Sequence, residues 1–383
     1  MEPVYFDWAA SSWPKPPEVV RAVTELLAGN GANPGRGGHR LAMAASRSIY
    51  ECRVELATLF GVKKATDIAL LSNATEALNL AIKGFLRPGD HVIATELEHN
   101  SVRRPLEWAR QHRQVEVTYV GASPEGVLDL KAAAAAFRPT TRLFVVSHAS
   151  NLLGSVAPLA AIAELCQKHQ VKLLVDAAQT AGSFSIEVEK QGIDMLAFPG
   201  HKGLLGPQGT GGLYIHPDIE LEPILQGGTG NNSEDIQQPT VRPERYEAGT
   251  RNTPGIAGLR EGVRFIRAKG VHSIRMEEQA RITQLHEGLA AIPGIRCLGP
   301  RVGEERASLI SFIKEGEDPA VTAHRLDREY GIAVRAGYHC SPLGHQTAGT
   351  LESGAVRASV GYATTNEQVE YLLDSVRRMA ACP

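Results

Sequence analysis

Cysteine is scarce in this sequence, with five residues among 383, at positions 52, 166, 297, 340 and 382. Their odd number, their wide spacing and the lack of any C-x-x-C pair argue against a disulfide framework and against a zinc cluster. No apolar run approaches the ~18 residues that a membrane-spanning helix needs. The N-terminus has no basic segment followed by an apolar one, so no secretory signal is indicated. We therefore expect a cytoplasmic protein with no membrane partner.

Blocks of like charge are absent as well. The 40 Lys and Arg residues nearly balance the 42 Asp and Glu residues, for a formal charge of −2. This balance gives no reason to expect nucleic acid as a partner and favours small molecules or proteins. The composition, 43% hydrophobic and 21% charged, is that of a globular protein with a large core, and the length predicts two domains at roughly 100–200 residues each.

Between residues 67 and 216 short apolar runs alternate with polar turns and helical stretches. This alternation predicts an α/β fold, and the continuously apolar runs indicate strands covered on both faces of a mostly parallel sheet. Seven strands are predicted: Asp67–Ser72, His91–Glu96, Val115–Val120, Arg142–His148, Lys172–Ala177, Met195–Gly200 and Gly211–His216.

The flanking segments complete the predicted organisation. A helix ending at Gly61 leads into the first strand. Beyond about residue 255 we expect a smaller α+β domain, whose elements are strands at Arg306–Lys314, Ile332–Arg335 and Ala355–Val360, a helix at Asp318–Tyr330 and a last helix with a Thr365/Gln368 capping box. The Gly227–Pro243 stretch is predicted to be a functional loop. The predicted division is a large domain of residues 15–255 and a small domain of residues 1–14 and 256–383.

Reactive and polar residues follow several predicted strands, at the sheet edge where open parallel sheets bind ligands. Ser72 to Glu76 open a helix whose N–H groups suit a phosphate, although an ordinary helix cap explains them as well. His99 suits stacking on a planar cofactor or relaying a proton, and a structural role is the alternative. Asn151 suits a carboxylate or a phenolic oxygen, or a simple turn.

The next two strand ends carry an acid and a lysine. Asp176 ends an apolar run, where a carboxylate is costly without a cationic or hydrogen-bonding partner. Lys202 follows Gly200 and precedes a glycine-rich segment that lacks the order of a nucleotide-binding loop, and such a lysine suits a Schiff base with a carbonyl cofactor. Together, a phosphate cradle, a stacking ring, a buried acid and a lysine are the parts that pyridoxal phosphate requires.

At these residues the sequence resembles the class V aminotransferases of the fold-type I pyridoxal-phosphate superfamily, and within them the cysteine desulfurase and selenocysteine lyase branch. The resemblance covers nearly the whole chain. Its most specific motifs are Asn73-Ala74-Thr75-Glu76-Ala77-Leu78-Asn79, Glu98-His99, Asp176-Ala177-Ala178-Gln179, Gly200-His201-Lys202, Glu247-Ala248-Gly249-Thr250 and Arg335-Ala336-Gly337-Tyr338-His339-Cys340.

The resemblance implies a role for each matched position. Lys202 would hold pyridoxal 5'-phosphate covalently, Asp176 would pair with its ring nitrogen, and His99 would stack on the ring. Gln179 would contact the phenolic oxygen. The phosphate would be bound by Ala74, Thr75 and His201, joined by Thr250 from the other subunit of a homodimer. Arg357 would bind the substrate carboxylate in bidentate fashion, with Asn151 assisting and Arg36 near the entrance.

Cys340 is matched to the nucleophile of the desulfurases. The resemblance implies conversion of L-cysteine to alanine with a persulfide on Cys340, for which the site has to favour the thiolate or supply a base, with His339 or the cofactor as candidates. A flexible-looking stretch, Ser341 to Gly354, follows Cys340. The interval from Cys340 to Arg357 is short, which resembles the second group of desulfurases, whose members tend to rely on a dedicated sulfur acceptor. Three questions stay open: whether selenocysteine is a further substrate, which molecule accepts the sulfur, and whether the sulfur goes to iron–sulfur assembly or to another route.

Three positions depart from the family's pattern. Pro199 stands where a Ser or Thr hydroxyl usually binds the phosphate, so one hydrogen bond is missing or replaced. Tyr338 replaces a commoner His, and Ser341 a commoner Ala. These changes leave the cofactor prediction intact and weaken the substrate prediction.

Two other functions remain as hypotheses. A C–S lyase of the same family would eliminate sulfur from cystine or cysteine, give pyruvate and need no protein thiol. A degenerate scaffold without activity would be expected to lack Lys202 or Asp176, and both are present.

Overall fold

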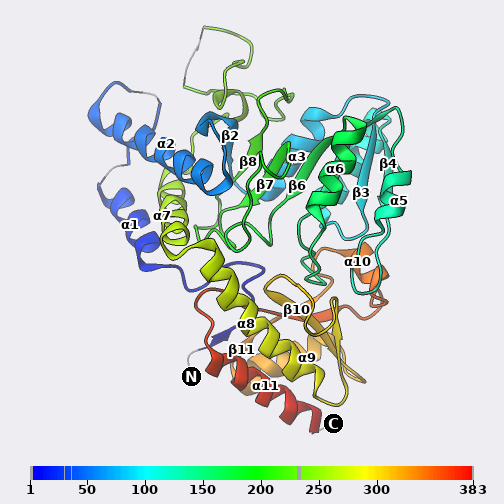
Figure 1. Ribbon diagram of the computed structural model, residues 1–383. Coiled ribbons are helices and arrows are strands. Elements are labelled where there is room, and N and C mark those ends of the chain that lie inside the picture. Colours follow the sequence, from blue (N-terminus) through cyan, green and yellow to red (C-terminus); the bar gives the residue numbers. More distant parts are fainter. Residues whose placement is uncertain (1–2, 30, 36, 231–233, 382–383) are drawn as a thin grey trace.

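The computed structural model describes residues 3–29, 31–35, 37–230 and 234–381. Its centre is a seven-stranded sheet in the order β2-β8-β7-β6-β5-β3-β4 (Figure 1). The strands are β2 (Ile68–Leu71), β3 (His91–Thr95), β4 (Glu116–Val120), β5 (Thr141–Ser147), β6 (Lys172–Asp176), β7 (Met195–Pro199) and β8 (Gly211–Ile215). All seven predicted strands are therefore confirmed, to within one residue at each end.

The sheet is mixed, because β8 runs antiparallel to both of its neighbours, while every pairing among β3 to β7 is parallel. Its parallel strands place Ser147, Asp176 and Pro199 at one edge, since each of these residues ends its strand. The mostly parallel seven-stranded α/β sheet predicted from the sequence is confirmed.

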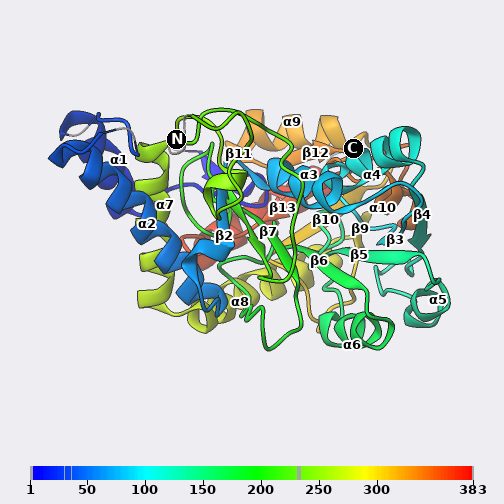
Figure 2. The same ribbon diagram turned by 90° about the horizontal axis from the view of Figure 1, so that it is seen from above.

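Helices cover both faces of this sheet, as Figure 2 shows from above. They are α2 (Arg40–Phe60), α3 (Ala74–Phe85), α4 (Asn100–Arg113), α5 (Leu130–Ala135), α6 (Leu159–His169) and α7 (Thr253–Lys269). Helix α1 (Pro17–Gly29) packs on the outside of α7. One core cluster joins α2, α6 and α7 to one face, and a second joins α3 and α4 to the other. The strands are apolar throughout because both of their faces are buried.

A second layer is built on an antiparallel sheet in the order β12-β13-β10-β9. Its strands are β9 (Ile295–Leu298), β10 (Leu309–Lys314), β12 (Arg335–Gly337) and β13 (Ala355–Ser359), and it packs with α8 (Val271–Ala290), α9 (Pro319–Tyr330) and α11 (Asn366–Ala381) around a third core. The Thr365/Gln368 capping box is confirmed by reciprocal bonds of 3.1 and 3.2 Å. The division of the chain into domains near residue 255 stays a prediction.

The sequence prediction was incomplete or wrong at three places in this region. The strand predicted at 332–335 is two short strands in different sheets, β11 (Ile332–Ala333), which pairs with β1 (Val4–Tyr5), and β12. The strand β9 and the helices α7 and α8 were not predicted. The stretch from Ser341 to Gly354 contains helix α10 (Pro342–Thr347), which begins at a proline and buries His345 against Thr350, its Nδ1 lying 2.7 Å from the Thr350 hydroxyl.

The Gly227–Pro243 segment is neither helix nor strand over its described residues, as predicted, and two short 3-10 turns, Ala65–Asp67 and Glu244–Tyr246, complete the elements. Among the described residues, none of the helices combines the length and hydrophobicity that crossing a bilayer requires.

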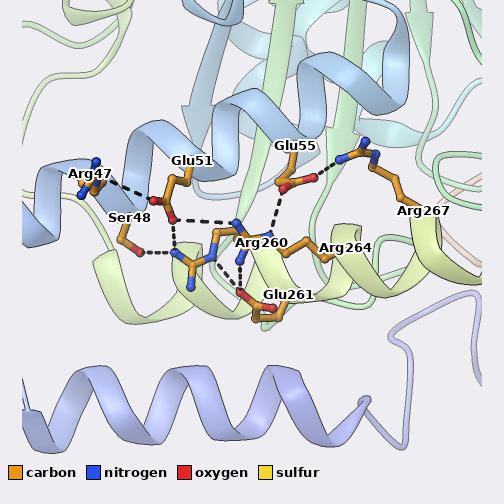
Figure 3. A network of polar contacts seen from close by, with 8 residues as sticks. All are labelled: Arg47, Ser48, Glu51, Glu55, Arg260, Glu261, Arg264 and Arg267. Carbon is orange, nitrogen blue, oxygen red and sulfur yellow. Dashed lines mark hydrogen bonds and ion pairs between the residues drawn. The ribbon is translucent and has the colours of Figure 1, made fainter.

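Helices α2 and α7 are joined by a network of ion pairs, drawn in Figure 3. Glu51 accepts from Arg260 at 2.7 Å, and Glu55 accepts from Arg264 Nε at 2.9 Å and from Arg267. Burial opposes ionisation of Glu55, yet the hydrogen bonds from these two arginines lower its pKa overall. Glu55 thus serves two cations of a neighbouring helix at once.

We expect Glu55→Gln to lower the free energy of unfolding by about 1 kcal/mol, above the usual value for an exposed pair because two partners are lost. Chemical denaturation measures the change, and about 1 M salt should shrink it by screening. The matched control is Glu107→Gln, whose arginine partner Arg110 lies on its own helix and whose removal should change stability much less. Equal effects of the two substitutions would contradict the prediction.

Candidate functional site

A cavity of about 230 Å³ lies at the carboxyl ends of β5, β6 and β7. Its wall includes the last residue of each of these strands, so the cavity occupies the edge at which open α/β sheets bind ligands. A larger hollow of about 1070 Å³ lies elsewhere, at the amino end of β6. Lysines in its wall form ion pairs, among them Lys63 with Glu189 and Lys172 with Asp194. The smaller cavity is the candidate site because an amine, a carboxyl group, guanidinium groups and imidazoles line it together.

Nine of the site residues predicted from the sequence line this one cavity. They are Ala74, Thr75, His99, Asn151, Asp176, Gln179, His201, Lys202 and Arg357. Three others do not: Cys340 lies next to the lining residue His339, Thr250 lines a separate cavity of about 340 Å³, and Arg36 lies outside the described residues.

Lys202 and Asp176 bring an amine and a carboxyl into the same cavity. Part of the Lys202 side chain faces the open space, but burial of the rest, together with Arg357, lowers its pKa to about 8. Burial raises the pKa of Asp176, opposed by a hydrogen bond of 2.9 Å from the Ala178 N–H and by the charge of Lys202. The site therefore offers a nucleophilic amine near neutral pH and a carboxyl that needs a cationic partner to stay ionised.

The N-terminus of α3 forms one end of the cavity. Asn73 caps the helix by accepting from the Glu76 N–H at 2.9 Å, while Ala74 and Thr75 in its first turn line the wall. His201 lines the same cavity, and its buried Nδ1 has no hydrogen-bond partner among the described residues. A helix N-terminus and an unpartnered ring nitrogen that line one cavity suit an anion. Pro199 contributes no hydroxyl and no N–H to this cradle.

His99 caps α4 through its ring. Its Nδ1 accepts from the Ser101 N–H at 3.0 Å. Burial, reinforced by the charge of Lys202, lowers the pKa of His99 to about 4, so the ring is neutral at physiological pH. A neutral ring fixed by its cap is suited to packing against a planar group.

Arg357, at the middle of β13, is 1% exposed and is held at two points. One amino group donates to the Asn151 carbonyl at 2.9 Å and the other to Asp7 at 3.1 Å, while Nε has no hydrogen-bond partner in the described part of the chain. Burial lowers the pKa of this guanidinium and Asp7 opposes the shift. A fixed guanidinium with an unused N–H at the cavity wall suits a carboxylate.

Asn151 does more than predicted. Its side-chain amide donates to the His339 carbonyl at 2.6 Å, and its backbone carbonyl accepts from Arg357. It therefore links the cavity to the segment that carries Cys340.

Cys340 is half-buried and lies in a constrained segment. His339 and Cys340 are consecutive residues with positive φ angles of 50° and 58°, which non-glycine residues seldom adopt. The Asn100 N–H donates to the Cys340 carbonyl at 2.8 Å, which anchors the strained turn. The charge of a Cys340 thiolate also acts on Arg357 and raises the pKa of that guanidinium, although less than burial lowers it. Cys340 directly follows His339, which lines the cavity and whose carbonyl accepts from the Asn151 amide.

His339 is a weak candidate for the base that the sequence analysis considered. Burial, followed by the charge of Arg357, lowers the pKa of His339 to about 3. Its ring stacks on His345 with centroids 5.9 Å apart, and its Nε2 lies 3.2 Å from the Arg335 carbonyl.

Sequence reasoning gave no role to three residues of the site: Asp7, Ser101 and Arg335. Arg335 begins one of the motifs that carry the family resemblance, so its position was the available signal, and Asp7 lies in the N-terminal part of the chain that the resemblance also covers. Ser101 had no such signal, because its importance comes from its contacts with Thr75 and His99 at 2.8 and 2.9 Å.

Comparison with known proteins places the chain among enzymes. The family model described as aminotransferase class-V matches residues 4–372. A probable cysteine desulfurase of Methanothermobacter thermautotrophicus is 37% identical, over 98% of this chain and 94% of the relative.

Two solved structures are similar over nearly their full lengths. The apo structure of a cysteine desulfurase from Thermococcus onnurineus NA1 matches with a TM-score of 0.93 and 33% identity, covering 99% of this chain and 95% of that one. A cysteine desulfurase from Escherichia coli matches with a TM-score of 0.88 and 26% identity, covering 98% and 94%.

Proposed function

This chain belongs to the aminotransferase class-V family, and from that membership and its cavity we propose that it is a pyridoxal-phosphate-dependent cysteine desulfurase. The reaction converts L-cysteine to L-alanine and leaves the sulfur as a persulfide on Cys340. The observation that carries the proposal is that Lys202 and Arg357 line one cavity and that Cys340 directly follows the lining residue His339.

The residues of the cavity fit the cofactor. The unpartnered His201 Nδ1 and the N-terminus of α3 would take its phosphate, and the buried Asp176 carboxyl would pair with its ring nitrogen. His99 would pack on the ring, and Gln179, whose side chain donates to the Ala9 carbonyl at 3.2 Å, would lie at its edge. When bound, the cofactor supplies an electron sink for the bonds at the substrate's α-carbon.

The protein's own groups then handle the proton and the carboxylate. Lys202 would hold the cofactor covalently and, once freed, would accept the α-proton at Nζ, for which a pKa near 8 is well matched to neutral pH. Arg357, fixed by Asp7 and the Asn151 carbonyl, would bind the substrate carboxylate through its unused Nε–H.

Cys340 would carry out the sulfur transfer. Its thiolate attacks the substrate sulfur, so an S–S bond forms as the Cβ–S bond breaks. The electron pair of the broken bond stays with the substrate carbon, which takes up a proton and leaves as alanine. Cys340 keeps the sulfur atom as a persulfide, and no outside oxidant or reductant is needed until an acceptor removes it.

Turnover of L-cysteine in the presence of a thiol reductant tests the function. Alanine and sulfide in equal amounts are expected. Formation of pyruvate and ammonia in place of alanine would contradict the proposed desulfurase activity and identify the protein as a C–S lyase. If the protein does not bind pyridoxal phosphate, both the cofactor assignment and the proposed function are wrong.

A homodimer with shared sites is part of the proposal. The exposed face of α2 carries Met43, Tyr50 and Val54, and Thr250 is exposed in a second cavity near that helix. An apolar face beside a residue expected to reach the partner's phosphate supports a second copy of the chain as the occupant. Light scattering on the purified protein tests this, and a monomer would contradict it. Selenocysteine, a protein acceptor for the sulfur and a cytoplasmic location remain predictions.

The lowered pKa of Lys202 predicts how cofactor capture depends on pH. Only the neutral amine attacks the cofactor's carbonyl, and a lysine whose pKa is lowered to about 8 is neutral above that pH. The rate of capture by the apo-protein should rise about tenfold per unit below about pH 8 and level off above it. Stopped-flow absorbance across this range measures it. A rate that still climbs near pH 10 would indicate an ordinary, exposed lysine.

A further inference from the structure

The hydroxyl groups of the cavity are few. Among the residues that line it, Thr75, Ser101 and Ser147 carry one. Ser147 is committed elsewhere, since its Oγ donates to Glu98 at 2.8 Å and its N–H donates to the same carboxylate at 3.0 Å. Pro199, at the end of β7, has neither a hydroxyl nor an N–H to offer. The hydroxyl groups that remain available near an anion in this cavity are those of Thr75 and Ser101, whose oxygens lie 2.8 Å apart.

Ser101 touches two parts of the site from a single position. It is buried near the start of α4, where its N–H donates to His99 Nδ1 at 3.0 Å. Because that nitrogen accepts, the proton of the neutral ring lies on Nε2. The Ser101 hydroxyl oxygen lies 2.9 Å from the same nitrogen and 2.8 Å from Thr75 Oγ1. Ser101 thus connects the histidine expected to pack on the ring with the threonine expected to bind the phosphate.

The direction of these hydrogen bonds follows from counting protons. The His99 nitrogen is already satisfied by the Ser101 N–H, so the single hydroxyl proton of Ser101 is available for Thr75 Oγ1. When Thr75 accepts that proton, its own hydroxyl proton has to point away from Ser101. Thr75 lies in the first turn of α3 and lines the cavity, which leaves its proton as a donor towards an anion there.

We propose that Ser101 is a positioning residue for the cofactor's phosphate group, whose hydroxyl orients the Thr75 hydroxyl towards the phosphate and compensates for the hydroxyl that Pro199 does not supply. The inference rests on the proposed function, because it requires a phosphate-bearing cofactor in this cavity. In this arrangement the phosphate is bound through two linked hydroxyl groups, that of Ser101 on α4 and that of Thr75 on α3, and receives no hydrogen bond from Pro199 at the end of β7.

The test compares two ligands that differ only in the phosphate. Apo-protein with Ser101→Ala is titrated with pyridoxal 5'-phosphate and with pyridoxal. The dissociation constant for pyridoxal phosphate should rise about tenfold, as for a lost hydrogen bond that supports a charged group, and that for pyridoxal should stay within about twofold. The substitution keeps the backbone N–H that fixes His99, so the ring contact should persist. The phosphorus-31 chemical shift of the bound cofactor should move as well.

Two further variants separate this role from a structural one. Ser101→Thr keeps the hydroxyl and should retain most of the affinity for pyridoxal phosphate. Ser375→Ala removes a serine hydroxyl that donates to a backbone carbonyl within α11, outside the cavity, and should change neither dissociation constant. An equal loss for both ligands in Ser101→Ala, or no loss for either, would overturn the proposal. Wild-type protein that binds no pyridoxal phosphate would instead overturn the proposed function.

Discussion

Alanine at position 202 is expected to abolish the turnover of L-cysteine, with residual activity at least about 10³-fold below the wild type. The side chain of Lys202 lines the cavity together with Asp176, and burial lowers its pKa to about 8. We propose this lysine as both the covalent anchor of the cofactor and the group that moves the α-proton. Among the described residues that line the cavity, Lys202 is the one lysine. The cofactor's absorbance near the visible edge, which depends on attachment to Lys202, should be lost together with activity.

Two controls sharpen this experiment. Lys202→Arg keeps a positive charge but has no nucleophilic amine, so it should be as inactive as the alanine variant. Lys172→Ala removes a partly exposed lysine paired with Asp194 at the far end of β6, and it should keep its activity and its absorbance. Substantial turnover by either Lys202 variant would remove this lysine from the mechanism and leave the cofactor assignment without its anchor.

The Cys340→Ala variant is expected to lose formation of alanine and sulfide by at least about 10²-fold while keeping the bound cofactor and its absorbance. The thiol lies beside the cavity rather than in its wall, so its removal should leave Lys202, Asp176 and His99 in place. Quantification of alanine, sulfide and pyruvate in the same reactions gives the result. The substitution should leave stability nearly unchanged. Cysteine and alanine both carry a Cβ, so the strain of the positive φ angle of 58° at this position is the same in both proteins.

The matched control is Cys297→Ala. Cys297 lies in β9, where burial raises its pKa to about 11, so it is a poor nucleophile at neutral pH. Its removal should leave desulfuration unchanged. If Cys340→Ala and the wild type form pyruvate at the same rate, sulfur transfer through Cys340 is refuted and the protein is a C–S lyase on the same scaffold.

Much of the central sheet could be predicted because its strands are apolar throughout and separated by turn residues. The same pattern located Asp176 and Lys202, since the carboxyl ends of parallel strands meet at one edge. The antiparallel direction of β8 has no such signal, because a strand buried on both faces is equally apolar in either direction. Helix α10 was also missed, because Gly344 and the polar residues around it are typical of loops, while the burial of His345 that stabilises the helix depends on tertiary contacts.

Distant pairs account for most of what the sequence did not indicate about the site. The contact between Thr75 and Ser101 joins two helices that follow different strands, and neither residue differs from an ordinary helix-capping residue when taken alone. Thr250 shows the opposite case, since the resemblance implied a role near the phosphate, whereas within one chain this residue lines a different cavity. Its role stays a prediction that requires a second copy.

The pairing of Arg357 with Asp7 has a consequence for how the protein is made. These residues are 350 positions apart, and β1 beside Asp7 pairs with β11, so the first residues of the chain are bound by some of its last. A ribosome synthesising the chain at about 5–20 residues per second exposes Asp7 long before its partner exists. The large sheet can assemble on the nascent chain during that time, but the Arg357–Asp7 pair, where we propose that the substrate carboxylate binds, cannot. Any protein released prematurely upstream of β13 would lack that corner, so truncated products should bind cofactor without acting on an amino acid.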